Sequence, residues 1–165
     1  MIKLKNLKMK HYTKMNNGYY AVALDKKSCN VVKRNATMDV VVGDHITLAY
    51  KPNNKTFEKL NKLCGKKVDV YIKEKRANNN IEAFWLNGMY LTETYKKLKR
   101  IDKGPAHITI SHKKGFKSGD ANSMFKDPGN PQWLGIDHEL GYLKGEVKWI
   151  SFNNKKEKND NRPIR

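Results

Sequence analysis

Two short segments of the chain repeat the same order of chemically useful side chains. They are His45-Ile46-Thr47 and His107-Ile108-Thr109, which are offset by 62 residues, and both continue into an apolar residue. Both segments are β-prone, and in a strand side chains two residues apart point to the same face. Each segment is therefore predicted to present an imidazole beside a hydroxyl, with its isoleucine turned toward the core.

The chemistry that such a pair offers is proton transfer. Imidazole titrates near neutral pH, so one histidine can accept a proton while the other donates one. Cleavage of a phosphodiester bond needs both steps, because a base activates the attacking hydroxyl and an acid protonates the departing oxygen. Thr47 and Thr109 would donate hydrogen bonds to nonbridging phosphate oxygens as charge builds in the transition state. We predict that His45, Thr47, His107 and Thr109 are catalytic; the alternative is that both segments are half-strands facing solvent.

The segments that must position these residues are mostly short strands. Strands are predicted at 19–24, 45–50, 67–73, 81–86, 106–111 and 142–152, and 40–42 is β-prone. A helix of about three turns is expected from Asn54 to Gly65, with a helical turn or two within 26–35 and a short helix near Ser118. One clear helix between two sets of strands indicates an α+β fold.

The net charge indicates a polyanionic partner. The chain has 34 Lys+Arg against 16 Asp+Glu, which gives a formal net charge of +18. Such an excess attracts polyanions through long-range attraction and counterion release. The basic run 96–100 precedes the second His-x-Thr segment, where it either steers phosphate groups or forms an ordinary solvated face. Charge alone does not separate RNA, DNA, nucleotides and a membrane surface.

A single intracellular domain is the simplest organisation. The length of 165 residues fits one catalytic domain over 1–152, followed by a flexible basic tail over 153–165. Cys29 and Cys64 are far apart in the sequence, which favours a reducing compartment such as the cytoplasm. No apolar run is long enough to cross a membrane, and no secretory signal is expected. No metal site is expected, because no cluster of ligating residues has the required spacing. The oligomeric state stays open.

The two tetrapeptides resemble the signature of the 2H phosphoesterase superfamily. The matching residues are His45-Ile46-Thr47-Leu48 and His107-Ile108-Thr109-Ile110, and the likeness extends over about 19–149 as a layout. The resemblance implies a two-lobed α+β fold with antiparallel sheets forming a central cleft, and catalysis without a metal or other cofactor. It leaves open which histidine is the acid, although His107 is favoured as the base.

Within that superfamily, the chain looks most like the phage anti-CBASS nucleases, which degrade cyclic oligonucleotide immune signals. The likeness rests on chain length, on Tyr12 before the first strand, on the segment 21–25 and on Trp149 in the last strand. It implies that Tyr12 and Trp149 stack on substrate bases. Trp85 is a further candidate for substrate binding, with packing at the core or the lobe interface as the alternative.

The implied reaction is cleavage of 3′-5′ bonds in cyclic di- or oligonucleotides by attack of a ribose 2′-hydroxyl. A phage-encoded enzyme of this kind would act in the host cytoplasm. Two other functions stay open: a phosphodiesterase acting on RNA 2′,3′-cyclic phosphate ends or 2′-5′ oligonucleotides, and a noncatalytic RNA-binding module. In each case the expected ligand is a cyclic nucleotide or an RNA-like polyanion.

Overall fold

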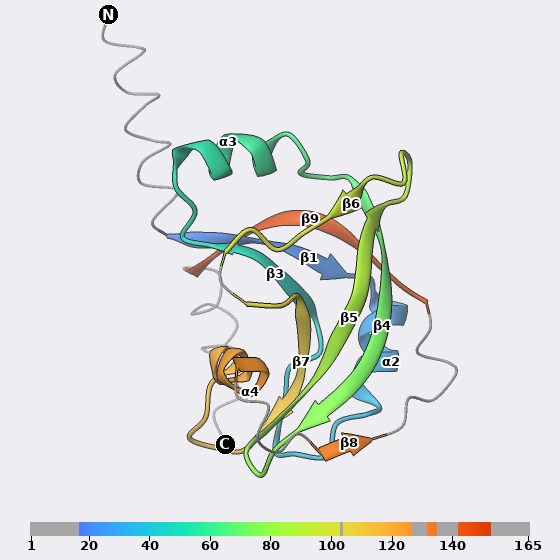
Figure 1. Cartoon of the computed structure of the whole chain (residues 1–165), viewed down its shortest axis with the longest axis vertical. Coiled ribbons are helices and arrows are strands. Elements are labelled where there is room, and N and C mark those ends of the chain that lie inside the picture. Colours follow the sequence, from blue (N-terminus) through green and yellow to red (C-terminus); the bar gives the residue numbers. More distant parts are fainter. Residues whose placement is uncertain (1–16, 103, 127–131, 135–141, 153–165) are drawn as a thin grey trace, which may run out of the picture.

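A computed structural model describes residues 17–102, 104–126, 132–134 and 142–152 of the chain (Figure 1). The predicted basic tail over 153–165 lies outside these residues. In the part of the chain that is described, nine strands join into one sheet. The strands are β1 (Gly18–Leu24), β2 (Val40–Val41), β3 (His45–Tyr50), β4 (Lys67–Ala77), β5 (Ile81–Leu91), β6 (Lys97–Leu98), β7 (His107–His112), β8 (Gln132–Leu134) and β9 (Leu143–Ser151).

The sheet is antiparallel, open and strongly curled. Its main path runs β2-β7-β5-β4-β9-β1-β3, with β6 beside β5 and β8 beside β4. Although β3 and β7 are far apart along that path, they pack against each other (Figure 1). Backbone hydrogen bonds from the flanking segments support this packing: Gly43 N, before β3, donates to Thr109 O (2.9 Å), and Ile101 N, before β7, donates to Leu48 O (2.8 Å). The α+β class is confirmed, and the expected antiparallel sheets are the two halves of one continuous sheet.

One apolar core lies behind the two His-x-Thr segments. Ile46, Leu48, Ile108 and Ile110 are fully buried in it, as the alternation of side chains in a strand requires. Burial of such side chains contributes about 1.5–3 kcal/mol each, so the core fixes which face the intervening His and Thr side chains must take.

Two short helices cover the core. They are α2 (Lys26–Lys33), which buries Val32, and α3 (Asn54–Asn61), which buries Phe57 and Leu60. Asp25 and Asn53 cap their first turns by accepting hydrogen bonds from the backbone N–H groups of Ser28 (2.7 Å) and Thr56 (2.9 Å), respectively. A third helix, α4 (Ala121–Lys126), follows a 3-10 turn at Ser118–Asp120.

Two expectations about element length were wrong. Helix α3 has two turns rather than three, because the chain leaves the helix after Asn61 and turns through 62–65. Gly65 adopts a φ of 85°, the left-handed conformation that glycine tolerates best. Strands β4 and β5 are longer than predicted, since each continues past its apolar alternation as part of one antiparallel ribbon.

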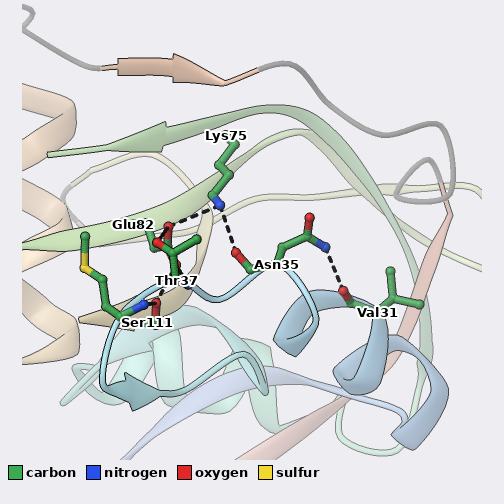
Figure 2. Close-up of polar contacts among 7 residues, drawn as sticks. Val31, Asn35, Thr37, Lys75, Glu82 and Ser111 are labelled. Atoms are coloured by element: carbon green, nitrogen blue, oxygen red, sulfur yellow. Dashed lines mark hydrogen bonds and ion pairs between the residues drawn. The ribbon is translucent and has the colours of Figure 1, made fainter. Parts of the chain in front are cut away.

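A buried polar network fastens the segment after α2 to the sheet (Figure 2). Glu82 of β5 accepts hydrogen bonds from the backbone N–H (2.6 Å) and the hydroxyl (2.9 Å) of Thr37. It also accepts one from the Ser111 hydroxyl of β7. Lys75 of β4 forms an ion pair with Glu82 (3.1 Å) and donates to the carbonyl of Asn35 (2.8 Å). Three strands and one loop therefore share a single cluster of charge and hydrogen bonds.

Among the helices of the described residues, none has both the length and the apolar character needed to cross a membrane.

Candidate active site

The two His-x-Thr segments occupy equivalent places in two copies of one strand pair. In β1–β3, Ala21 and Ala23 lie opposite Thr47 and His45; in β5–β7, Ala83 and Trp85 lie opposite Thr109 and His107. The same offset of 62 residues therefore relates both strands of one pair to both strands of the other. The sequence revealed the repeat only in the His-x-Thr segments.

Both strand pairs are irregular at the same point. The register shifts directly after the threonine, so that Leu48 has no residue opposite it in β1 and Ile110 has none opposite it in β5. A bulge of this kind bends a strand and re-aims its side chains. The two bulges let the strands curve around a shared space while Leu48 and Ile110 stay buried in the core.

That shared space is a pocket of about 830 Å³. All four residues predicted to be catalytic line it: His45, Thr47, His107 and Thr109. The other lining residues are Tyr19, Tyr50, Arg100, Asp102, Lys117, Ser118, Gly119, Asp120, Asn122 and Phe152. The structure therefore brings the two segments, which are distant in sequence and along the sheet path, to one cavity.

Each imidazole is held through its Nδ1 atom. His45 Nδ1 lies 2.6 Å from a carboxylate oxygen of Asp44, and His107 Nδ1 lies 3.0 Å from the backbone carbonyl of Pro105. A carbonyl oxygen only accepts, so His107 Nδ1 carries a proton and Nε2 is the nitrogen that accepts one when the ring is neutral. The Asp44 carboxylate can accept a hydrogen bond from His45 Nδ1 and so orient this ring.

The environment of His107 keeps its imidazole neutral. Burial lowers the pKa of His107 from 6.5 to about 4, which outweighs the opposing effect of the Pro105 carbonyl. Positive charge at Arg100 lowers this pKa further. A neutral, Nδ1-protonated His107 can accept a proton at Nε2 and so can act as a base.

The two threonines differ in exposure. Thr47 is half-buried, whereas Thr109 is buried and its hydroxyl donates to the backbone carbonyl of Ser118 (3.3 Å). The Thr109 hydroxyl must therefore rotate away from Ser118 before it can donate to a bound phosphate.

The pocket also has an aromatic rim that the sequence analysis did not single out. The rings of Tyr19, Tyr50 and Phe152 lie 5.5–6.2 Å apart between centroids. Tyr50 is 54% exposed, and the Lys51 ammonium lies 5.7 Å from its ring centroid. Tyr19 also contacts the ring of His45 at 5.5 Å, and burial raises the pKa of its phenol, which keeps the group protonated.

Two of the three residues predicted to bind substrate outside the motifs, Trp85 and Trp149, do not line this pocket. The ring centroid of Trp149 lies 4.9 Å from that of Tyr20 and 5.5 Å from that of Phe57, so this side chain packs beside the core. Trp85 lies opposite His107 but stacks with the Arg76 guanidinium, 3.6 Å from the ring centroid. Tyr12 lies outside the described residues.

The basic run before the second segment divides into different roles. Arg100 lines the pocket with a side chain that is 8% exposed, Leu98 belongs to the core, and Lys96, Lys97 and Lys99 are exposed. The run was predicted as a unit, but its residues point in different directions.

Within the residues that the structure describes, no group of three or more His, Cys, Asp or Glu side chains is placed to hold a metal ion.

Comparisons with known proteins yield one distant likeness. No protein-family model matches the chain, and no curated protein matches it. Among solved structures, a fungal RNA kinase is similar, with a TM-score of 0.44 and 15% sequence identity. The match covers 82% of this chain and 44% of that chain, so the chain spans less than half the length of the kinase structure. A likeness this weak carries no conclusion about function.

Proposed function

We propose that the protein is a phosphodiesterase that needs no metal ion and cleaves 3′-5′ bonds of cyclic di- or oligonucleotides. The observation that carries the proposal is the placement of His45 and His107 in one pocket, each held through Nδ1 by a different acceptor. Two imidazoles in different electrostatic settings supply the base and the acid that phosphodiester cleavage requires.

In the proposed reaction, Nε2 of His107 takes the proton from a ribose 2′-hydroxyl of the substrate. The 2′-oxygen then bonds to the adjacent phosphorus, and the bond from phosphorus to the 5′-oxygen breaks. His45 gives its proton to the departing 5′-oxygen. The products are a 2′,3′-cyclic phosphate end and a 5′-hydroxyl end. Thr47 and Thr109 donate hydrogen bonds to the nonbridging oxygens, whose negative charge grows in the transition state.

The substrate class is supported by charge and by the pocket rim. A net charge of +18 favours a polyanion, and the exposed Tyr50 ring beside Phe152 offers a surface on which a nucleobase can stack. The cyclic form of the substrate comes from the resemblance to anti-CBASS nucleases. An RNA 2′,3′-cyclic phosphate end or a 2′-5′ linkage would use the same two histidines, so these substrates belong in the same assay.

A mixed panel of cyclic dinucleotides, cyclic trinucleotides, 2′-5′ oligonucleotides and short RNAs tests the proposal. The chain is incubated with the panel in EDTA, and the products are identified by mass spectrometry. We expect linear products ending in a 2′,3′-cyclic phosphate, and no cleavage of analogues in which the attacking 2′-hydroxyl is replaced by hydrogen.

Three outcomes would count against this function. Salt-sensitive binding of RNA without any product would favour the noncatalytic RNA-binding module. Activity that EDTA abolishes would contradict the metal-free mechanism. Equal cleavage of the 2′-deoxy analogues would contradict attack by the 2′-hydroxyl while leaving hydrolysis by water in place.

A further inference from the structure

Arg100 is a buried cation whose guanidinium is fixed on one side by the protein. Its side chain is 8% exposed, and Nε forms an ion pair with the carboxylate of Asp102. Nη1 donates to the side-chain oxygen of Asn122 (2.8 Å), with a longer contact to the carbonyl of Pro105 (3.5 Å). Because three acceptors hold Nε and Nη1, the plane and direction of the guanidinium are set before any ligand binds.

The remaining nitrogen, Nη2, is available to a ligand. It has no hydrogen-bond partner among the residues that the structure describes. No fully buried side-chain nitrogen or oxygen in this part of the chain lacks a partner, so Nη2 is not sealed inside the protein. Arg100 lines the pocket, so the cavity is within reach of its guanidinium. A preorganised N–H donor of this kind is matched to an anionic oxygen.

The contacts of Arg100 also tie it to both motif strands. The Pro105 carbonyl that meets Nη1 is the same oxygen that accepts from His107 Nδ1 (3.0 Å). The second carboxylate oxygen of Asp102 accepts from the backbone N–H of Tyr50 (2.9 Å), at the end of β3. The guanidinium is therefore positioned by the same groups that position the His107 ring and the end of the His45 strand.

We propose that Arg100 binds the substrate phosphate, donating through Nη2 to a nonbridging oxygen of the group that is cleaved. This inference rests on the proposed function for the identity of the substrate. It assigns a ligand, a phosphate oxyanion, to a residue outside the two His-x-Thr segments. Arg100 would add a fixed positive charge to the two threonine hydroxyls as negative charge builds on phosphorus oxygens.

Phosphate binding tests the assignment without any turnover. Inorganic phosphate is titrated into the protein while NMR signals of the His45 and His107 rings are followed, so that phosphate bound elsewhere on the basic surface is not counted. We expect Arg100→Gln to raise the Kd for phosphate at least about tenfold. Arg34→Gln removes an exposed positive charge after α2, away from the pocket, and should leave this Kd unchanged.

Loss of the buried Arg100 charge can also unfold the chain, so a second variant is needed. Arg100→Lys keeps the charge but loses the planar fork that Asp102 and Asn122 hold. Thermal unfolding establishes that each variant is folded before its binding is compared. A folded Arg100→Lys or Arg100→Gln protein that binds phosphate as tightly as the wild type overturns the proposal.

Phosphorothioate substrates distinguish a direct contact with phosphate from a structural role of Arg100. A structural role alone would not change the preference for one diastereomer. Sulfur replaces one of the two nonbridging oxygens in the Rp or the Sp diastereomer, and Arg100 faces only one of these positions. The wild type should prefer one diastereomer, and this preference should be lost in Arg100→Lys. An unchanged preference would overturn the contact. A wild type that shows Arg100-dependent phosphate binding but cleaves nothing would refute the proposed function and leave the anion site standing.

Discussion

At the scale of one residue, the burial of His107, our proposed base, also bears on the stability of the fold. Desolvation favours the neutral ring, and the Pro105 carbonyl holds the proton on Nδ1. The folded protein therefore holds the His107 imidazole neutral at neutral pH. As a consequence, acid lowers the free energy of unfolding, because the unfolded chain protonates its histidines at ordinary pKa values.

The sign of this effect is testable. Between pH 6.5 and about 4, unfolded His107 binds a proton that folded His107 does not, so the free energy of unfolding falls as the pH falls. A pKa difference from 6.5 to about 4 corresponds to roughly 3 kcal/mol. Urea titrations at pH 7 and pH 4 should show the wild type losing about this much more stability than His107→Gln, which has no ring to protonate. An equal loss in both proteins would mean that His107 titrates normally in the fold.

Single residues were predictable where a local pattern marked them. His45, Thr47, His107 and Thr109 stand out because their spacing of two residues matches the strand period. Nothing in the local sequence marks Asp102 or Asn122, since each reaches the pocket only after the sheet has curled and the loop before α4 has packed beside β7. Trp149 is a different case: the family resemblance implied base stacking, whereas the structure packs its ring against Tyr20 and Phe57 beside the core.

At the scale of elements, the Glu82 network links β4, β5 and β7 next to the bulge in β7. Burial alone would raise the pKa of Glu82, but hydrogen bonds from Ser111 and Thr37, and from Lys75, outweigh it and lower the pKa. The group is therefore a carboxylate with its charge paired. Because Ser111 follows the bulge at Ile110, the network holds the strand on the far side of the bulge from Thr109.

Removal of this carboxylate should be costly. Glu82→Ala leaves the buried Lys75 ammonium without its ion-pair partner, which is expected to lower the free energy of unfolding by about 3–5 kcal/mol. Glu58→Ala removes an exposed carboxylate from α3 and should change stability by no more than about 0.5 kcal/mol. Equilibrium urea unfolding measures both. Similar losses in the two variants would show that the network does not stabilise the sheet.

Strands were easier to predict than their ends. The alternation of Val68 and Val70 marked β4, but its continuation to Ala77 depends on pairing with β5 and β8, which no local pattern encodes. The helix at α3 was overextended because Leu63 continues the apolar spacing, although it packs against the core from a turn. Sequence period identifies an element, and tertiary contacts decide where it stops.

For the whole molecule, we expect the net charge of +18 to affect the binding of substrate more than the rate of the chemical step. We expect KM for an oligonucleotide to rise steeply with KCl concentration between about 50 and 200 mM while kcat changes little, because salt competes for the basic surface and not for the buried His107. Steady-state kinetics in a KCl series measures this. A salt-independent KM would mean that the excess of lysine does not contact the substrate.

The curled sheet is what turns two distant segments into one candidate site. Each half contributes one imidazole, and neither half contains a complete acid–base pair. If both rings act on the same phosphate, they form a functional unit, and the losses from removing them are not independent.

The most direct test of a shared phosphate is to measure kcat/KM on a cyclic oligonucleotide in EDTA. The variants compared are His45→Ala, His107→Ala and the double variant. His112→Ala, at the end of β7 and away from the pocket lining, is the matched control. Each single variant should lose at least about 100-fold, and the double variant should be little worse than the weaker single one. Near-wild-type activity in either single variant, or losses that multiply in the double variant, would contradict a shared phosphate.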